Sequence, residues 1–280
     1  MNKEILLENN DSIDKYNEFK IITNKKFTEE IIQEKSIFSN FTEMRKITIS
    51  ESGTYEIENK NRFISIDILE NLNVEIIEIE KETDFKFYND TKISVGKNSN
   101  LKILSLDKFE GGHNSKIFDV LENAHAEVNV VGFNNGYNEN KIIINLNEEG
   151  ASSNLKIITI ANTNTHAIYE NRINNNAPKT KADIRQKAVM KNGGMNDFVT
   201  TGFIKKGSDD ASNYQESRVL LLDDASLGNA SPLLLIDHYN VVAGHAAGVS
   251  RVNEDDLYYL QTRGISKDEA EKLMTLAFVK

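Results

Sequence analysis

Short apolar runs rich in Ile, Leu and Val recur along this chain at a nearly constant spacing. The starts of successive runs, at Val74, Leu101, Ala126, Leu155 and Ala182, lie 27, 25, 29 and 27 residues apart. Apolar and polar residues alternate within the runs, as they do on strands that bury one face. A repeat of about 20 to 50 residues that holds two strands is typical of stacked coils. The spacing therefore predicts a mainly β fold, with a β-solenoid from about residue 46 to residue 250.

The pattern alone leaves a β-sandwich open, because a sandwich also contains many short strands. The frequent Asn residues between the runs favour the solenoid, since Asn tolerates the left-handed backbone of tight corners. Gly193-Gly194 follows Lys191-Asn192 and predicts such a corner or a tight hairpin rather than a phosphate-binding loop.

The two ends of the chain carry helical signals. Residues 1–45 predict one helix, with Thr28 as N-cap, Glu29 and Glu30 in its first turn, and Ile31, Ile32, Lys35 and Phe38 following. After residue 250 two helices are predicted. Asn253 is the N-cap of the first, which Arg263 and Gly264 end. Ser266 and Glu269 form a capping box for the second.

The last predicted helix has a single apolar stripe made of Ala270, Leu273, Met274 and Ala277. A helix of roughly 12 residues is marginal by itself in water. The stripe therefore predicts burial, either against the body of this protein or against a partner.

Composition narrows the classes of partner and site. A formal charge of −10 argues against binding to a nucleic-acid backbone. The absence of Cys excludes disulfides, thiolate metal sites and Cys nucleophiles supplied by this chain. No apolar run approaches the roughly 20 residues that span a bilayer, and residues 1–10 do not read as a secretory signal. We expect a cytoplasmic protein that binds neither nucleic acid nor membrane.

No catalytic constellation is evident. The paired carboxylates Asp209-Asp210 and Asp223-Asp224 fit strand-end turns, and Asp255-Asp256 fits a helix cap. A carbohydrate-active β-helix remains an alternative, although it would need acidic groups clustered on one outer sheet. We therefore predict that the protein is not an enzyme.

His245 stands alone among small residues, between Gly244 and Ala246. Small neighbours let another backbone approach closely. From the sequence alone, a packed histidine bonded to a backbone carbonyl is the favoured interpretation, and a functional imidazole is the alternative.

Longer C-terminal motifs resemble the SufB/SufD family, the scaffold proteins of iron–sulfur cluster assembly. The resemblance rests on Ser231-Pro-Leu-Leu-Leu-Ile-Asp-His-Tyr-Asn-Val-Val-Ala-Gly-His-Ala-Ala-Gly-Val-Ser-Arg-Val252 and Asp256-Leu-Tyr-Tyr-Leu-Gln-Thr-Arg-Gly-Ile265. Upstream, His166-Ala-Ile-Tyr-Glu170, Lys181-Ala-Asp183 and the Gln215–Leu222 strand also fit. The match covers residues 160–280 well and residues 46–160 by pattern, and the Gly-His-Ala-Ala form is similar to SufD members.

The resemblance implies a right-handed parallel β-helix over residues 46–250. It also implies a short helical or extended segment at 1–45 and a helical segment at 251–280 that binds the ATPase SufC. Pairing with SufB is implied as well, although the isolated chain could form a homodimer. The implied SufC-binding residues are Leu257, Tyr258, Tyr259, Arg263, Gly264, Ala270, Leu273, Met274, Ala277 and Phe278.

With the resemblance, His245 matches the family's interface histidine, and Gly244 and Ala246 flank it. It would help hold iron or a nascent cluster shared with SufB, since neutral imidazole is a reasonable iron ligand. No cofactor is expected to bind stably to this chain alone, and binding of reduced flavin stays open. Ala243 stands where some members have Cys, and the N-terminal region is short. The alternative is a homomeric cytosolic structural solenoid or adaptor without metal chemistry.

Overall fold

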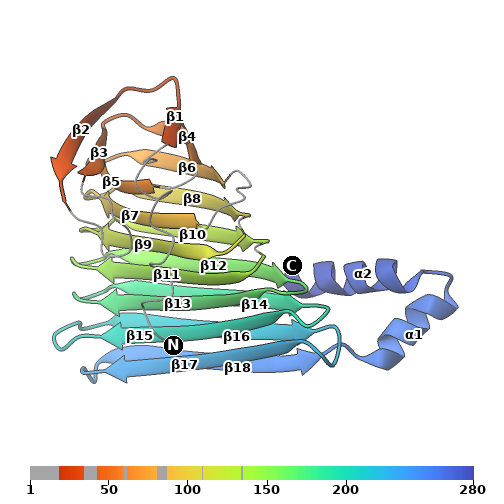
Figure 1. The fold of residues 1–280 in the computed structure, drawn as a ribbon. Coiled ribbons are helices and arrows are strands. Elements are labelled where there is room, and N and C mark those ends of the chain that lie inside the picture. The colour runs from red at the N-terminus through yellow and green to blue at the C-terminus, as the bar shows by residue number, and fades with distance from the viewer. Residues whose placement is uncertain (1–18, 35–42, 60–61, 81–86, 109, 134) are drawn as a thin grey trace.

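The computed structural model describes residues 19–34, 43–59, 62–80, 87–108, 110–133 and 135–280. Within them, the strands form two nine-stranded sheets, here named sheet A and sheet B, and from β3 onward successive strands alternate between the two. Figure 1 shows the coils stacked from the N-terminal strands to β17 and β18, with two helices projecting from the side of the stack.

Sheet A contains, in spatial order, β1 (Phe19–Ile22), β4 (Gly53–Asn59), β6 (Asn73–Glu80), β8 (Asn100–Asp107), β10 (His125–Gly132), β12 (Ser152–Ala161), β14 (Lys181–Met190), β16 (Ala211–Leu221) and β18 (Val241–Arg251). Sheet B contains β17 (Leu227–Ile236), β15 (Met195–Ile204), β13 (His166–Asn175), β11 (Tyr137–Leu146), β9 (Gly112–Val120), β7 (Phe87–Val95), β5 (Arg62–Ile68), β3 (Glu43–Ile49) and β2 (Phe27–Gln33).

The register confirms the predicted solenoid and corrects one alignment. Val74 pairs with Leu101, and Leu101 pairs with Ala126, in parallel strands. Ala126, however, pairs with Ser153 rather than with Leu155. A shift of two residues leaves the same side chains facing inward, so the alternation of apolar residues could not reveal it.

Asn residues form several corners of the coils, as predicted. Positive φ values occur at Asn71, Asn98, Asn123, Asn164 and Asn192. The Gly193-Gly194 pair forms the corner between β14 and β15, where Gly193 has a φ of +79°. A Cβ at Gly194 would lie 2.5 Å from the carbonyl oxygen of Ala161, so the previous coil leaves no room for a side chain there.

The predicted N-terminal helix is wrong where the structure describes it. Thr28, Ile31 and Ile32 lie in strand β2, which pairs antiparallel with β3. Lys35 and Phe38 lie outside the described residues. The free hydrogen-bonding edge of β3 provides a partner that a helix would not use. The β-branched residues also suit a strand, so tertiary pairing overrides the capping signal.

The inner faces are apolar except for buried polar clusters. Lys116 on β9 donates hydrogen bonds to Glu78 on β6 and to Ser105 on β8. The Lys116 and Glu78 side chains are 1% and 0% exposed, so their charges are removed from water together. Consequently Glu78 and Ser105 point inward, while the neighbouring Ile79 and Leu106 point outward.

Lys116→Met is expected to lower the free energy of unfolding by about 3–5 kcal/mol, because it leaves the Glu78 carboxylate buried without its counter-charge. Denaturant unfolding measures this loss. The double variant Lys116→Met, Glu78→Met should recover most of the stability, since apolar replacement of a buried ion pair is often neutral. A single variant within about 0.5 kcal/mol of the wild type would contradict the buried pair.

The C-terminal helices begin and end as predicted. Helix α1 spans Glu254–Thr262, and the Asn253 side chain accepts a hydrogen bond from the Asp255 N–H at 3.0 Å. Gly264, with a φ of 86°, follows it. Helix α2 spans Lys267–Val279 and has the Ser266–Glu269 capping box. In the described part of the chain neither helix, at 9 and 13 residues, is long enough to cross a bilayer.

Candidate functional site

No described strand pairs with the outer edges of β17 and β18, so the C-terminal end of the solenoid is open in the described part of the chain. Strands β17 and β18 are the last members of sheets B and A, and both are largely exposed. Exposed large apolar side chains at this end are Leu227, Leu233, Leu235, Ile236, Val242 and Val249, together with Tyr239 in the connecting loop. Neither strand carries a charged residue before Arg251. Protected edge strands usually carry charges, so this end has the character of a pairing surface.

Hydrogen-bond directions show which edge is available. The Val252 N–H donates to the Leu221 carbonyl at 2.9 Å. Because successive residues of a strand turn their N–H and C=O groups to opposite sides, those of His245 and Ala247 face the open edge.

At the end of β17 the Asp237 N–H donates to the Ile204 carbonyl at 2.9 Å. By the same alternation, Pro232 faces the open edge. Proline has no N–H to donate and interrupts a pairing edge. Strand β18 is therefore the unblocked edge.

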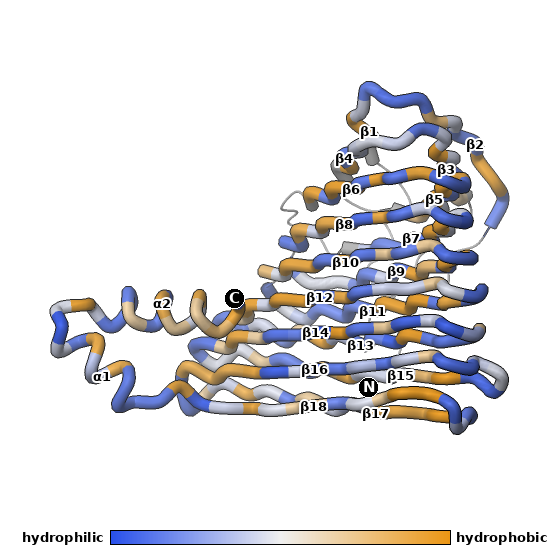
Figure 2. The backbone as a smooth tube through the Cα atoms, turned by 180° about the vertical axis from the view of Figure 1, so that it is seen from behind, coloured by the Kyte–Doolittle hydropathy of each residue, from blue (hydrophilic) through white to orange (hydrophobic). Residues whose placement is uncertain are grey.

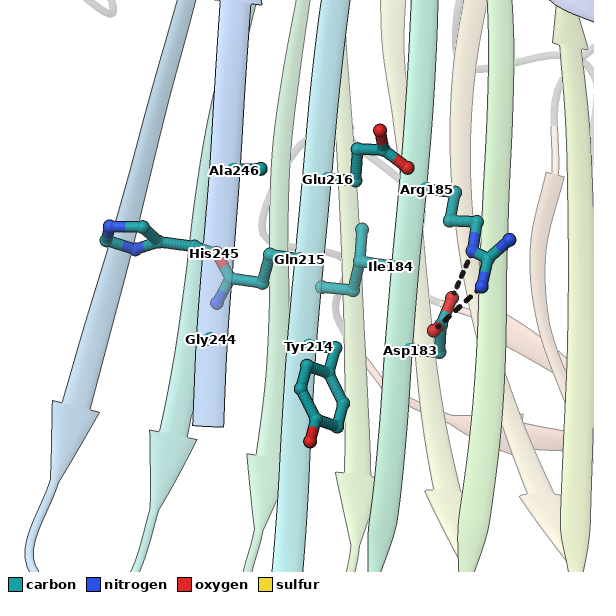
Figure 3. A pocket seen from close by; sticks show the side chains of 9 residues that line it. All are labelled: Asp183, Ile184, Arg185, Tyr214, Gln215, Glu216, Gly244, His245 and Ala246. Atoms are coloured by element: carbon teal, nitrogen blue, oxygen red, sulfur yellow. Dashed lines mark hydrogen bonds and ion pairs between the residues drawn. The ribbon is translucent and has the colours of Figure 1, made fainter. Parts of the chain in front are cut away.

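The three predicted interface residues lie on opposite faces of β18. His245 is in register with Gln215, whose side chain is buried inside the solenoid. It therefore shares the inner face, which the open end exposes. Gly244 and Ala246 lie on the outer face, beside a pocket of about 520 Å³ whose lining includes Asp183, Arg185 and Tyr214. Figure 3 shows the imidazole pointing away from Tyr214.

Among the described histidines, His245 is the exposed one without a polar partner. The recorded partners of the other four are Glu139 for His113 at 3.6 Å, Ser152 for His125 at 2.9 Å, Asp197 for His166 at 2.6 Å and Asp209 for His238 at 2.9 Å. Burial lowers the pKa of His113 and of His125. Within the described residues, no backbone carbonyl accepts a hydrogen bond from His245, so the interpretation of a packed histidine is not supported.

The paired carboxylates lie in turns and in a helix cap, as predicted, and several have structural partners there. The hydrogen bond from His238 lowers the pKa of Asp209. Asp223 closes the corner after β16 by accepting the N–H groups of Ala225 and Ser226 at 3.0 and 2.9 Å. Asp255 and Asp256 occupy the first turn of α1.

Helix α2 is held against the solenoid by two lysines, one in β14 and one in the corner that follows it. Lys187 donates to the Phe278 carbonyl at 2.8 Å, and its ammonium lies 5.9 Å from the centroid of that ring. Lys191 pairs with Glu271 at 2.5 Å, and the hydrogen bond raises the pKa of the lysine. One side of α2 is thus held against the body of the protein.

The predicted single stripe on α2 is split between two sides. Ala270 is buried and Met274 and Phe278 are half-buried, which places this i, i+4, i+8 row toward the body. Leu273 and Ala277 are exposed, and Leu276, absent from the predicted stripe, is exposed beside them. Figure 2 shows hydrophobic stretches on both projecting helices.

On α1 the remaining predicted residues are also accessible. Tyr258 and Tyr259 are exposed and Leu257 is half-buried. Arg263 is exposed and stacks over the Tyr259 ring, 5.1 Å from its centroid, and Gly264 is exposed after it. The exposed side chains Tyr258, Tyr259, Leu273 and Leu276 form what we call the hairpin surface.

The described residues do not hold a metal by themselves. No group of three or more His, Cys, Asp or Glu side chains is placed to bind an ion within the described ranges. His245 fits the role of a single ligand, because its imidazole is exposed and uncommitted. The other ligands would have to come from outside the described residues.

Comparison with known proteins agrees with the fold and its C-terminal motifs. The SUF system FeS cluster assembly, SufBD core domain matches residues 53–278. SufD of Bacillus subtilis is 37% identical over 135 residues, which are 48% of this chain and 31% of that protein. SufB of the same organism is 29% identical over 135 residues, 48% of this chain and 29% of that protein.

A SufBD family protein of Mycobacterium tuberculosis is 33% identical over 104 residues, covering 37% of this chain and 12% of that protein. The matched segment thus spans less than a third of the length of these relatives. The family domain nevertheless covers most of the present chain, including both open-end strands and both helices. The chain therefore belongs to the SufBD core family of iron–sulfur cluster assembly, and it is more similar to the SufD than to the SufB of Bacillus subtilis.

Proposed function

We propose that this chain is a non-enzymatic, cytoplasmic scaffold subunit that pairs with a SufB subunit through β18 and carries a SufC ATPase on its hairpin surface. The observation that carries the proposal is the open end, where an unblocked strand edge, exposed apolar side chains and an uncommitted His245 occur together. His245 would then face the partner at the junction and contribute one ligand to iron or a nascent cluster, the cargo of the assembly.

A SufB partner suits this chemistry better than a second copy. The chain has no Cys, so a homodimer would offer imidazoles without thiolates. Iron–sulfur clusters are held mainly by Cys thiolates. The relatives include both SufD and SufB proteins, and a SufB subunit could supply the missing thiolates.

The helices are attached directly to the proposed pairing edge. Strand β18 ends at Arg251 and α1 begins at Glu254. If an ATPase bound to α1 and α2 moved these helices, the movement would therefore be transmitted to β18 and to the junction beside His245. This connection gives ATP hydrolysis a route to open the interface to iron and sulfur.

Ala247→Pro is expected to abolish pairing with SufB, because it removes an N–H that faces the open edge while sparing the bonds to β16. Size-exclusion chromatography with light scattering of the mixed subunits measures the pair. Ala247→Ser keeps the N–H and serves as the matched control. The pairing proposal fails if both variants form the heteromer as the wild type does.

The same measurement examines the alternative of a structural solenoid. A homomeric protein would form dimers or polymers alone and would gain no mass from SufB. If the chain behaves in this way and Ala247→Pro reduces the homomer to monomers, the open edge is a site of self-association.

A further inference from the structure

Behind His245 the solenoid contains a buried amide with an unused acceptor. Gln215 is 3% exposed, and its Nε2 donates to the Leu233 carbonyl on β17 at 3.2 Å. Its Oε1 is buried and has no hydrogen-bond partner among the described residues. An unpaired buried acceptor costs about 1–3 kcal/mol. Such a cost is commonly tolerated where the group has a functional role.

Gly202 on β15 makes room for this amide. A Cβ at Gly202 would lie 2.4 Å from Gln215 Nε2 and 2.4 Å from Asn213 Oδ1. The inner face at this position therefore requires glycine for the two amides to occupy the space. Residues of both sheets therefore shape the space that these buried amides occupy, Gly202 on β15 in sheet B and Asn213 and Gln215 on β16 in sheet A.

Gln215 is the direct neighbour of His245 across the strand pair. The two residues are in register, so their backbones are about 4.8 Å apart and their side chains project from the same face. Along β18 the residues on that face beside His245 are Ala243 and Ala247, which have no polar side chain. In Figure 3 the Gln215 amide lies beside the backbone end of His245.

These observations have one chemical consequence for an imidazole. A neutral histidine that binds a metal through one nitrogen carries a proton on the other, and an acceptor usually holds that N–H. The Leu233 carbonyl holds the amide nitrogen of Gln215, which leaves the oxygen to act as the acceptor. Nδ1 is the imidazole nitrogen nearer the backbone and hence nearer this amide.

We infer that Gln215 is a positioning residue for His245: the two side chains are not hydrogen-bonded in this structure, and when the imidazole turns toward the amide, Oε1 accepts the Nδ1–H and leaves Nε2 free to bind a metal ion at the open end. This inference rests on the proposed function only for the identity of the ligand. The hydrogen bond itself concerns two residues of this chain, so it can be measured in the isolated protein.

The experiment is 15N NMR of the histidine side chains in the metal-free full chain at pH 8, where an imidazole of ordinary pKa is neutral. The expected result is an Nδ1–H tautomer for His245, assigned by its loss in His245→Ala. Gln215→Leu should convert it mainly to the Nε2–H form that imidazoles prefer in water. Gln215→Glu should retain Nδ1–H because it retains an acceptor.

Two further variants separate positioning from folding. Gln186→Leu removes another interior amide, 1% exposed, which hydrogen-bonds to Thr200 and Ser217 and is not in register with His245. It should destabilise the solenoid without changing the His245 tautomer. Gly202→Ala should shift the tautomer as Gln215→Leu does, because it displaces the amide without replacing it.

An Nε2–H tautomer in the wild type, or a tautomer that Gln215→Leu leaves unchanged, would overturn the inference. These outcomes are independent of cluster maturation. If the tautomer responds as expected and His245→Ala matures clusters normally, the proposed function fails and the positioning stands. If the tautomer does not respond and His245→Ala is defective, the inference alone fails.

Discussion

Replacing Leu273 and Leu276 with Asp is expected to abolish SufC binding. Both side chains are exposed on α2, 48% and 63% respectively. Burying a fully exposed leucine contributes about 1.5–3 kcal/mol, and about half of each side chain is still exposed, so the two together would contribute about 1.5–3 kcal/mol. Since 1.4 kcal/mol corresponds to about tenfold in affinity, losing both contacts should weaken binding at least about tenfold. A carboxylate at either position would add a desolvation cost.

The solenoid should remain folded in this variant, since exposed substitutions usually change stability by about 0.5 kcal/mol or less. Met274 is left unchanged, although it belongs to the predicted stripe. It is half-buried against the body of the protein. Met274→Asp could therefore displace α2, and a loss of binding in that variant would not show that Met274 contacts SufC.

Calorimetric titration with SufC measures the affinity. The matched control is Leu104→Asp with Leu106→Asp, which changes two leucines of similar exposure, 41% and 42%, on the outer face of β8. This control should bind SufC normally. Equal affinity of the hairpin variant and the control would refute the hairpin surface as the docking site.

Much of the architecture could be predicted because the repeat and the helix caps are local signals. The interval from Val74 to Leu101 equals the register of β6 and β8. Asn253 and Ser266 cap their helices as their residue types indicate. Such signals depend only on residues that are close together along the chain, so they can be recognised without knowledge of the tertiary structure.

The errors arose where distant residues decide the structure. Thr28 followed by two glutamates resembles a helix start, but this segment pairs with the edge of β3 and therefore forms a strand. A second feature that the sequence does not decide is which face of β6 is buried, because the run Ile76-Ile77-Glu78-Ile79 has isoleucines on both faces. The inward direction of Glu78 depends on Lys116, which is 38 residues away.

The sequence could propose a position for the candidate site but not its geometry. The small residues around His245 indicated an approachable surface, and the family motif indicated an interface. Which face the imidazole occupies depends on the register with Gln215. The split of the α2 stripe likewise depends on Lys187 of β14 and on Lys191 just after it, whose contacts with α2 no periodicity reveals.

His245→Ala is expected to leave folding and SufB pairing intact and to reduce cluster maturation. The side chain is exposed and has no polar partner in the described part of the chain, so its removal should alter stability by about 0.5 kcal/mol or less. Loss of an interaction at a metal centre typically costs about 10–100-fold in affinity or activity, and loss of a ligand should cost at least as much. His238→Ala, at the same end but bonded to Asp209, is the matched control.

The most direct test of the account is the activity of an iron–sulfur enzyme such as aconitase in cells whose only SufD-type subunit is this chain or its variant. We predict that His245→Ala lowers that activity at least about tenfold, while the variant still co-purifies with SufB and SufC and His238→Ala matures clusters normally. Wild-type activity with His245→Ala would contradict the assignment of the open end as a site of cluster assembly.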